Sequence, residues 1–252
     1  MRYRHDPDLE FLSQMKSEDL NDLVHCLVYD RDGSARLTEE LTSRQRYQQL
    51  YPDHQKYWDL IAAEIQSFGA NTFATILRSG VGVPYKTVLT DVCDKLKVNY
   101  NRSASVEQIE GNLLMKILTV ALERMSPQEL KELAAATGVT NVNDFRGEAA
   151  IAAFQAAFWM GGFISYQLTV IIVNAVAKVL LGRGLTLAGN MALTRTMALL
   201  TGPVGWAITG AWTAIDVAGA AYRVTIPAVI QIAALRRKHL YGGQAPPGPA
   251  SV

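Results

Sequence analysis

The C-terminal part of the chain contains few ionisable side chains, and their spacing suggests specific roles for them. Asp216 is the only acid after residue 148, and it stands seven residues before Arg223, on the same face of a continuous helix. The two side chains could form a buried ion pair that locks neighbouring helices together. Alternatively, Asp216 caps a helix or lies on the surface, and both interpretations stay open.

A basic cluster of Arg236, Arg237 and Lys238 closes the last predicted helix. Cations at this position interact favourably with the C-terminal end of the helix dipole. They are also suited to contact a protein partner or anionic lipid headgroups, where each basic residue adds ~1 kcal/mol. Because no aromatic residues are interleaved with them, the cluster does not predict nucleic-acid binding.

The sequence contains no pattern typical of catalysis, metal binding or cofactor binding. Asp91 and Asp94 lie one helical turn apart, but they belong to a polar helix face and are expected to be surface charges. The turn at residues 30–34 begins like a calcium loop but lacks the required Gly and Glu positions. Cys26 and Cys93 fit a reducing compartment. We therefore expect a cytoplasmic protein that is not an enzyme and has no metal site or cofactor.

The elements that position these residues are helices. Residues 1–148 have the periodicity of short amphipathic helices with recognisable ends. Ser105 and Ser126 each begin a capping-box pattern, and Gly138 is suited to end the helix that follows Ser126. Asp6, followed by a proline, is expected to begin a helix close to the N-terminus.

The second part of the chain has long runs without charge. Residues 149–177 form a run of 29 and residues 196–215 a run of 20, followed by a run of 12 at residues 224–235. A membrane-spanning helix needs ~20 apolar residues, so the first two runs are long enough. A turn and packing contact of a helical hairpin are predicted at Gly202, Pro203, Gly205 and Trp206.

Whether this hairpin enters a membrane stays open. Basic residues lie on both sides of the two long runs, so they predict no orientation across a bilayer. The first run also contains polar residues, among them Gln155, Ser165 and Asn174. A helix that is apolar nearly all round can equally be the buried centre of a protein. The hairpin is a membrane span, a soluble core, or a covered segment that is released onto membranes.

Charge divides the chain into two parts. Residues 1–148 contain 17 Lys and Arg against 22 Asp and Glu, whereas the following 104 residues contain 7 basic residues and one acid. Opposite charges favour packing of the two parts against each other.

We expect an all-α fold. It comprises an N-terminal charged multi-helix domain (1–148, with a short module at 1–36), a C-terminal Gly/Ala-rich apolar helical hairpin with a basic terminal helix (149–241), and a disordered tail (242–252).

Several stretches resemble the YaaW family of uncharacterised bacterial proteins. The resemblance is most specific at residues 202–205 and 221–232, and it continues at residues 236–237. Residues 6–12, 69–71, 80–85 and 91–96 also fit. The middle of such proteins is similar to ubiquinol–cytochrome c chaperones. The resemblance implies a helical protein that assists another protein, and it supplies no catalytic residues.

Two functions follow as hypotheses. In the first, a non-enzymatic helical protein associates with membranes, or inserts into them, through its apolar hairpin when a partner, a lipid or a pH change exposes it. In the second, a soluble chaperone or scaffold binds a protein partner through its N-terminal helices, and the hairpin is its core. The partner itself cannot be named from the residues.

Overall fold

Helices form the regular secondary structure of this protein. The computed structural model describes residues 2–37, 39–69, 82–140, 145, 147–185, 202–203 and 222–243. Apart from isolated β-bridges at Arg2 and between Tyr29 and Ala35, these residues contain no β-structure, so the all-α prediction is confirmed. In chain order the elements are η1 (Glu10–Gln14), α1 (Ser17–Val28), α2 (Gln45–Leu50), η2 (His54–Tyr57), α3 (Trp58–Gly69), α5 (Tyr85–Lys95), α6 (Val106–Leu122), α7 (Pro127–Thr137), α8 (Glu148–Trp159), α9 (Gly162–Leu181) and α11 (Tyr222–Tyr241).

Local sequence signals begin and end two of these helices as predicted. The Ser105 hydroxyl accepts the N–H of Gln108 at the start of α6, and the Ser126 hydroxyl accepts the N–H of Glu129 at the start of α7. Both are complete capping boxes. Gly138 ends α7 in the left-handed conformation, with φ at 76°.

The expectation for Asp6 is wrong, because this residue begins no α-helix. The first helical turn of the chain is the 3-10 helix η1, which starts at Glu10. The Asp6 carboxylate instead accepts the N–H of Tyr85, the first residue of α5, at 2.6 Å. Pro84 precedes α5 and has no side-chain acceptor, so a carboxylate from far away in the sequence satisfies this N–H.

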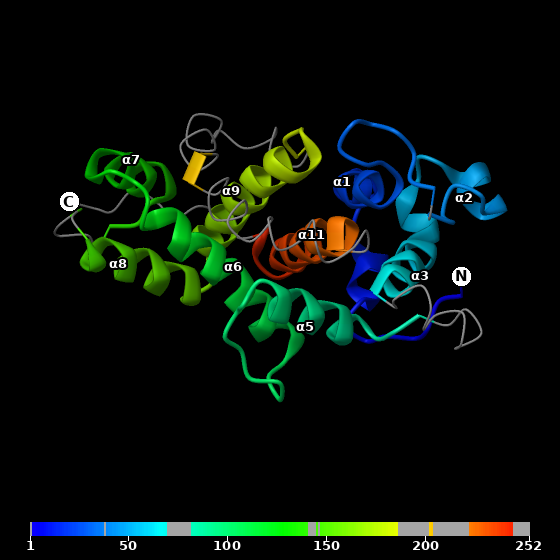
Figure 1. Ribbon diagram of the computed structural model, residues 1–252, viewed down its shortest axis with the longest axis horizontal. Helices are drawn as coiled ribbons and strands as arrows, with labels where there is room; N and C mark the ends of the chain where they lie inside the picture. Colours follow the sequence, from blue (N-terminus) through cyan, green and yellow to red (C-terminus); the bar gives the residue numbers. More distant parts are fainter. Residues whose placement is uncertain are drawn as a thin grey trace.

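The last helix, α11, lies in the middle of the molecule (Figure 1). It packs against α9, α1, α6, α5 and α3. Its apolar residues between Val224 and Leu235 are buried, and its interior proline, Pro227, is buried as well. Helix α11 therefore connects helices of the first part of the chain with helices of the second part, because it packs against both.

One hydrophobic cluster joins the two parts of the chain. It includes Leu23 on α1, Leu113 on α6, Ile171 on α9 and Ile230 on α11, all of which are fully buried. The acidic and the basic part are therefore packed against each other, as their opposite charges predicted.

The first long uncharged run is divided into two helices. After α8 the chain turns at Gly161 and Gly162, whose φ angles are 75° and 69°, and α9 follows. Among the described residues, α9 has the length and apolar composition to cross a membrane, but 78% of its most apolar stretch is buried inside the protein. This run therefore folds as two packed helices and not as one span.

Several predicted features fall on residues outside the described ranges. They include most of the second uncharged run, residues 196–215, and the tail from residue 244. The second arm of the hairpin therefore stays a prediction, whereas the first arm is the pair α8 and α9.

Replacing Gly161 or Gly162 with Ala tests the break between α8 and α9. A side chain at positive φ costs ~1–2 kcal/mol, and a Cβ at Gly161 would lie 3.3 Å from the Tyr241 hydroxyl. We expect the free energy of unfolding, measured in urea, to fall by about this amount. Gly202→Ala, where an added Cβ meets no atom of the described residues within 4 Å, is the control. A rise in stability would indicate a continuous helix, in which Ala is favoured over Gly.

Candidate functional site

Arg236 forms a buried ion pair with Glu110 of α6. Its Nε lies 2.7 Å from Glu110 Oε2, and the side chains are only 14% and 3% exposed. A second bond joins Arg236 Nη2 to Oε1 of the same carboxylate at 3.3 Å. The Tyr85 hydroxyl donates to Oε1 at 2.7 Å, and the guanidinium lies over the Phe11 ring. The pair thus joins α11, α6, α5 and η1 at one point.

Opposing effects act on the protonation of this pair. Burial raises the pKa of Glu110, and the charge and hydrogen bonds of Arg236 partly offset that rise. Burial and the neighbouring carboxylate also raise the pKa of Tyr85, which remains a hydrogen-bond donor. The carboxylate is therefore stable as an anion only while Arg236 remains beside it.

Two further cations of the second part pair with acids of α1. Lys238 pairs with Asp19, whose side chain is 5% exposed, and Arg183 lies 2.7 Å from Asp22, whose side chain is 7% exposed. The cations themselves are more exposed, so their long stems reach inward to carboxylates that are already buried. With Arg236, three cations from the basic part neutralise buried acids of the acidic part.

Arg237 has a different environment, in which its described partners are aromatic or neutral. Its guanidinium lies 4.4 Å from the Phe158 ring centre and 5.9 Å from that of Tyr241. One terminal nitrogen donates to the Ser165 hydroxyl, which in turn donates to the Phe158 carbonyl. Burial lowers the pKa of Arg237. The side chain therefore anchors the turn between α8 and α9 to α11.

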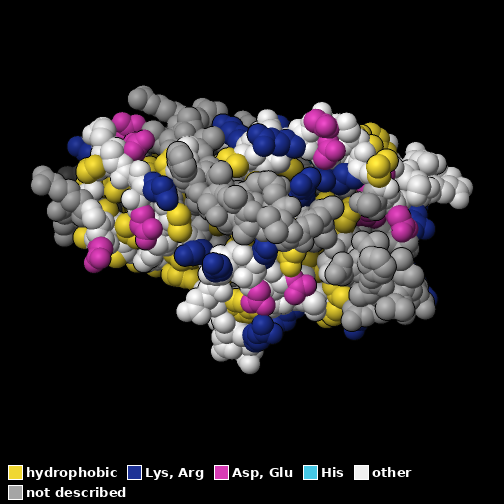
Figure 2. All heavy atoms as spheres, in the orientation of Figure 1, with side chains coloured by type: hydrophobic (Ala, Val, Ile, Leu, Met, Phe, Trp, Pro, Cys, Tyr) yellow, Lys and Arg dark blue, Asp and Glu magenta, His cyan; other side chains and the backbone are white. Residues whose placement is uncertain are grey.

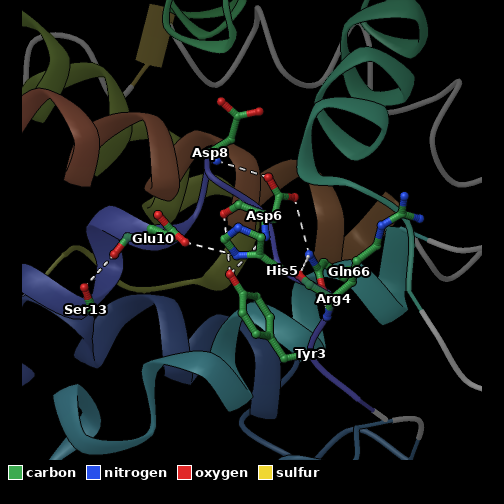
Figure 3. Close-up of polar contacts among 8 residues, drawn as sticks. All are labelled: Tyr3, Arg4, His5, Asp6, Asp8, Glu10, Ser13 and Gln66. Carbon is green, nitrogen blue, oxygen red and sulfur yellow. Dashed lines mark hydrogen bonds and ion pairs between the residues drawn. The ribbon is translucent and has the colours of Figure 1, made fainter.

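The N-terminal segment is attached to α3 by polar contacts with Gln66 (Figure 3). Asp6 is 4% exposed and accepts hydrogen bonds from the backbone of Asp8 and from the Gln66 amide. Gln66 also accepts the N–H of Arg4 at 3.0 Å and donates to its carbonyl at 2.9 Å. Because Arg236 Nη2 donates to the Asp8 carbonyl at 2.7 Å, this segment is continuous with the buried ion pair.

The structure describes some of the predicted site residues and not others. Gly202 and Pro203 lie in a short helical stretch and are at least partly exposed. The remaining predicted turn residues, Gly205 and Trp206, lie outside the described residues. Asp216 does too, so the pair with Arg223 stays a prediction. Arg223 itself is an exposed residue in the first turn of α11.

The basic cluster was expected to meet lipid or a partner, and here its cations face the protein. Arg236 and Arg237 are largely buried, and Lys238 is bound to Asp19. In this conformation the three side chains bind α6, α9 and α1, and lipid contact would require them to leave these partners.

Sequence reasoning missed the acceptors of these cations. Glu110 could have been found, because it lies between Ile109 and Leu113 on a face that the helical period buries. Asp19 and Asp22 interrupt the inward positions of α1 in the same way. An acid on an apolar face needs a cation, but the period does not say which one.

The cysteines and the acid pair that were considered for catalysis or metal binding all lie in the described part of the chain. Cys26 and Cys93 are free and buried, and burial raises the pKa of each thiol to about 12, far from a reactive thiolate. Asp91 and Asp94 are exposed, as expected, and Asp94 accepts from Tyr100. No group of three or more metal-ligand side chains occurs in the described ranges.

Comparison with known families and proteins identifies the class of this chain. Residues 53–230 match the family described as ubiquinol-cytochrome C chaperone, and residues 3–37 match a domain of unknown function, DUF3944. The chain is therefore a helical protein of a chaperone-like family. No solved structure matches it.

The relatives narrow this class to one family. A UPF0174 protein of Helicobacter pylori strain J99 is 54% identical over 94% of each chain, and a second one from this strain is 44% identical over 80% of this chain and 98% of the relative. The UPF0174 protein YaaW of Escherichia coli K12 is 34% identical over 94% of this chain and 96% of its own length. The chain belongs to the UPF0174 family, which confirms the resemblance to YaaW.

Replacing Glu110 with Gln tests the central ion pair. Removing one partner of a buried pair leaves an uncompensated charge, so we expect a loss of ~3–5 kcal/mol in the free energy of unfolding, measured in urea. The control is Asp94→Asn, because Asp94 and its partner Arg102 are 52% and 80% exposed. Such surface pairs contribute ~1 kcal/mol or less. Equal losses for the two variants would contradict the proposed importance of the buried pair.

The buried carboxyl group of Glu64 should make the stability of the protein depend on pH, independently of the pair between Arg236 and Glu110. It is 2% exposed, burial raises its pKa to about 7, and Oε1 accepts the N–H of Glu40. A carboxyl pKa raised on folding stabilises the protein below its ordinary value of 4.5, and this contribution is lost as pH rises through about 7. We expect Glu64→Gln to gain up to about 3 kcal/mol over the wild type between about pH 5 and about pH 8. A pH-independent difference in urea denaturation would contradict the assignment.

Proposed function

We propose that this protein is a non-enzymatic, chaperone-like protein of the cytoplasm that binds a protein partner through its N-terminal helices. The burial of α9 carries the proposal, because 78% of its most apolar stretch is covered by protein and it packs against α11. The apolar helices then serve as the core on which the N-terminal helices are mounted. The match to a chaperone family supports the same function.

The N-terminal helices leave apolar side chains in solvent, where a partner can bind. Leu37 is fully exposed, Tyr51 is 59% exposed, and α2, which ends next to Tyr51, buries none of its residues. The Tyr51 ring contacts those of Tyr47 and His54, with ring centres 5.4 and 5.7 Å apart, and more than half of the residue still faces solvent. Exposed aromatic side chains are enriched in protein interfaces, so the exposed positions Leu37 and Tyr51, which precede and follow α2, are the proposed partner site.

Site-specific crosslinking in cells tests this surface. A photo-reactive amino acid at Leu37 or Tyr51 is expected to capture one discrete partner protein, identified by mass spectrometry. The same amino acid at Lys131, an exposed residue of α7, is the control and is expected to capture none. If no protein is captured, or if all three positions capture the same mixture, the proposed partner surface is wrong.

Conditional membrane association is a second candidate function, favoured by the length and apolar composition of α9. To reach lipid, α9 must separate from α11, and the basic cluster must leave Glu110, Ser165 and Asp19. Burial raises the pKa of Glu110, so a fall in pH favours the closed protein over a form in which this carboxyl is exposed, and release must come from a partner or lipid that competes for the basic cluster.

Flotation with liposomes separates the two candidates. Purified protein is mixed with vesicles of phosphatidylcholine and phosphatidylglycerol at about pH 7 and about pH 5. The membrane function predicts that Glu110→Gln, which lacks the charge that holds Arg236, floats more than the wild type at both pH values. Recovery of both proteins in the soluble fraction under all conditions supports the chaperone-like function and contradicts the membrane function.

A further inference from the structure

The N-terminal segment, residues 2–14, is held by the rest of the chain as a bound peptide would be. The side-chain amide of Gln66 accepts the N–H of Arg4 at 3.0 Å and donates to the Arg4 carbonyl at 2.9 Å. Figure 3 shows this amide beside the backbone of the segment. Arg4 itself is exposed, so Gln66 recognises the main chain and not the side chain. Main-chain hydrogen bonds of this kind give affinity for peptides of many sequences.

Asp6 supplies the contact that depends on a particular side chain. Its carboxylate is 4% exposed and accepts the N–H of Tyr85, the first residue of α5, at 2.6 Å. The same oxygen accepts from the Gln66 amide at 3.3 Å. Because the start of a helix is the positive end of its dipole, an anion is favoured here over a neutral group. A peptide bound in this position therefore needs a carboxylate.

The segment continues with apolar side chains at regular spacing. Leu9 and Leu12 follow the carboxylate by three and six residues, and both are fully buried. Phe11 is 7% exposed, and the guanidinium of Arg236 lies 4.4 Å from its ring centre. Arg236 Nη2 also donates to the Asp8 carbonyl at 2.7 Å. The binding surface thus selects a carboxylate followed by two leucine-sized side chains.

The charges around the segment favour an acidic peptide. Burial and the charge of Asp6 raise the pKa of Asp8, whereas the charges of Arg236 and Lys86 lower it. The remaining acid at this place, Glu110, is compensated by its pair with Arg236. Without the segment, two cations and the start of α5 would face one carboxylate, which attracts negative charge. The outer face over α5 carries side chains of both signs (Figure 2), so this attraction is local to the binding surface.

The segment and its binding surface belong to different units of the sequence. Residues 3–37 match one family and residues 53–230, which include Gln66 and Tyr85, match another. Only two residues separate the end of η1 from the start of α1, so a change in their backbone would release the segment while α1 stays in place. Release would leave the Gln66 amide and the Tyr85 N–H without partners, and a second peptide that supplies them is then favoured.

We propose that the N-terminal segment is a built-in ligand and that an acidic, leucine-containing segment of a partner protein binds in its place. Gln66 holds the main chain of the partner segment, and the first N–H of α5 holds its carboxylate. Arg236 donates to a carbonyl that follows the carboxylate. This binding surface is separate from the exposed positions Leu37 and Tyr51, so it does not depend on the partner site proposed there.

A fluorescent peptide with the sequence of residues 2–14 tests the proposal on the full chain. In the wild type the same sequence already fills the surface, at an effective concentration of ~1 mM, so the peptide binds weakly. Asp6→Ala weakens the built-in segment and leaves its binding surface unchanged. We expect the peptide to bind this variant about tenfold more tightly than the wild type, measured by fluorescence anisotropy. Arg4→Pro, which removes the N–H that Gln66 accepts, is expected to act in the same direction if Asp6→Ala folds poorly.

Matched controls show whether the peptide uses the same contacts. Glu10→Gln changes an exposed side chain that pairs with His5 of the same segment, and this variant is expected to bind the peptide as weakly as the wild type. A peptide with Asp6→Ala should bind about tenfold more weakly, whereas one with Arg4→Ala should bind unchanged, because Gln66 contacts only the backbone there. The proposal is overturned if neither Asp6→Ala nor Arg4→Pro binds the peptide more tightly than the wild type. Equal binding of the peptides with and without the Asp6 carboxylate also overturns it.

Discussion

The ion pair between Arg236 and Glu110 constrains where the last helix of the chain can lie. Both charges are removed from water, and that cost is offset only when the two groups meet with good geometry. Tyr85 completes the coordination of the carboxylate, and the Asp8 carbonyl accepts from the guanidinium. The helices α6, α5 and η1 must therefore surround α11, and α9 and α1 pack on its remaining surface.

The unequal distribution of acidic and basic residues along the chain gives ion pairs between its two parts. The second part supplies Arg183, Arg236 and Lys238, and the first part supplies a buried acid for each of them. The excess of acids in one part and of bases in the other thus holds the two parts together. A consequence is that the basic end of α11 is occupied within the protein, and a partner or lipid has to bind elsewhere or displace it.

The apolar helices acquire their role from this packing. An uncharged run as long as residues 149–177 suggests a membrane, but the glycines at 161 and 162 turn the chain, and α9 is covered mainly by protein. Of the N-terminal helices, α1 and α3 pack directly on α11.

The sequence alone determined the features that depend on residues close together in the chain. Helices, the capping boxes at Ser105 and Ser126, the stop at Gly138 and the partition of charge were all predictable, because each rests on contacts three or four residues apart or on composition. The helical period also indicated which faces are buried. The resemblance to the YaaW family rested on the residue order of short stretches, and the relatives confirm it.

Only the tertiary structure decided which partners the charged and apolar side chains meet. Arg236 and Glu110 are 126 positions apart, and Lys238 and Asp19 are 219 positions apart, so no local pattern relates them. Asp6 caps α5, 79 positions away, although its own sequence context predicts a helix start. The sequence likewise did not decide whether protein or lipid covers α9. An apolar helix can be stabilised by either, and the sequence does not show which helices lie next to it.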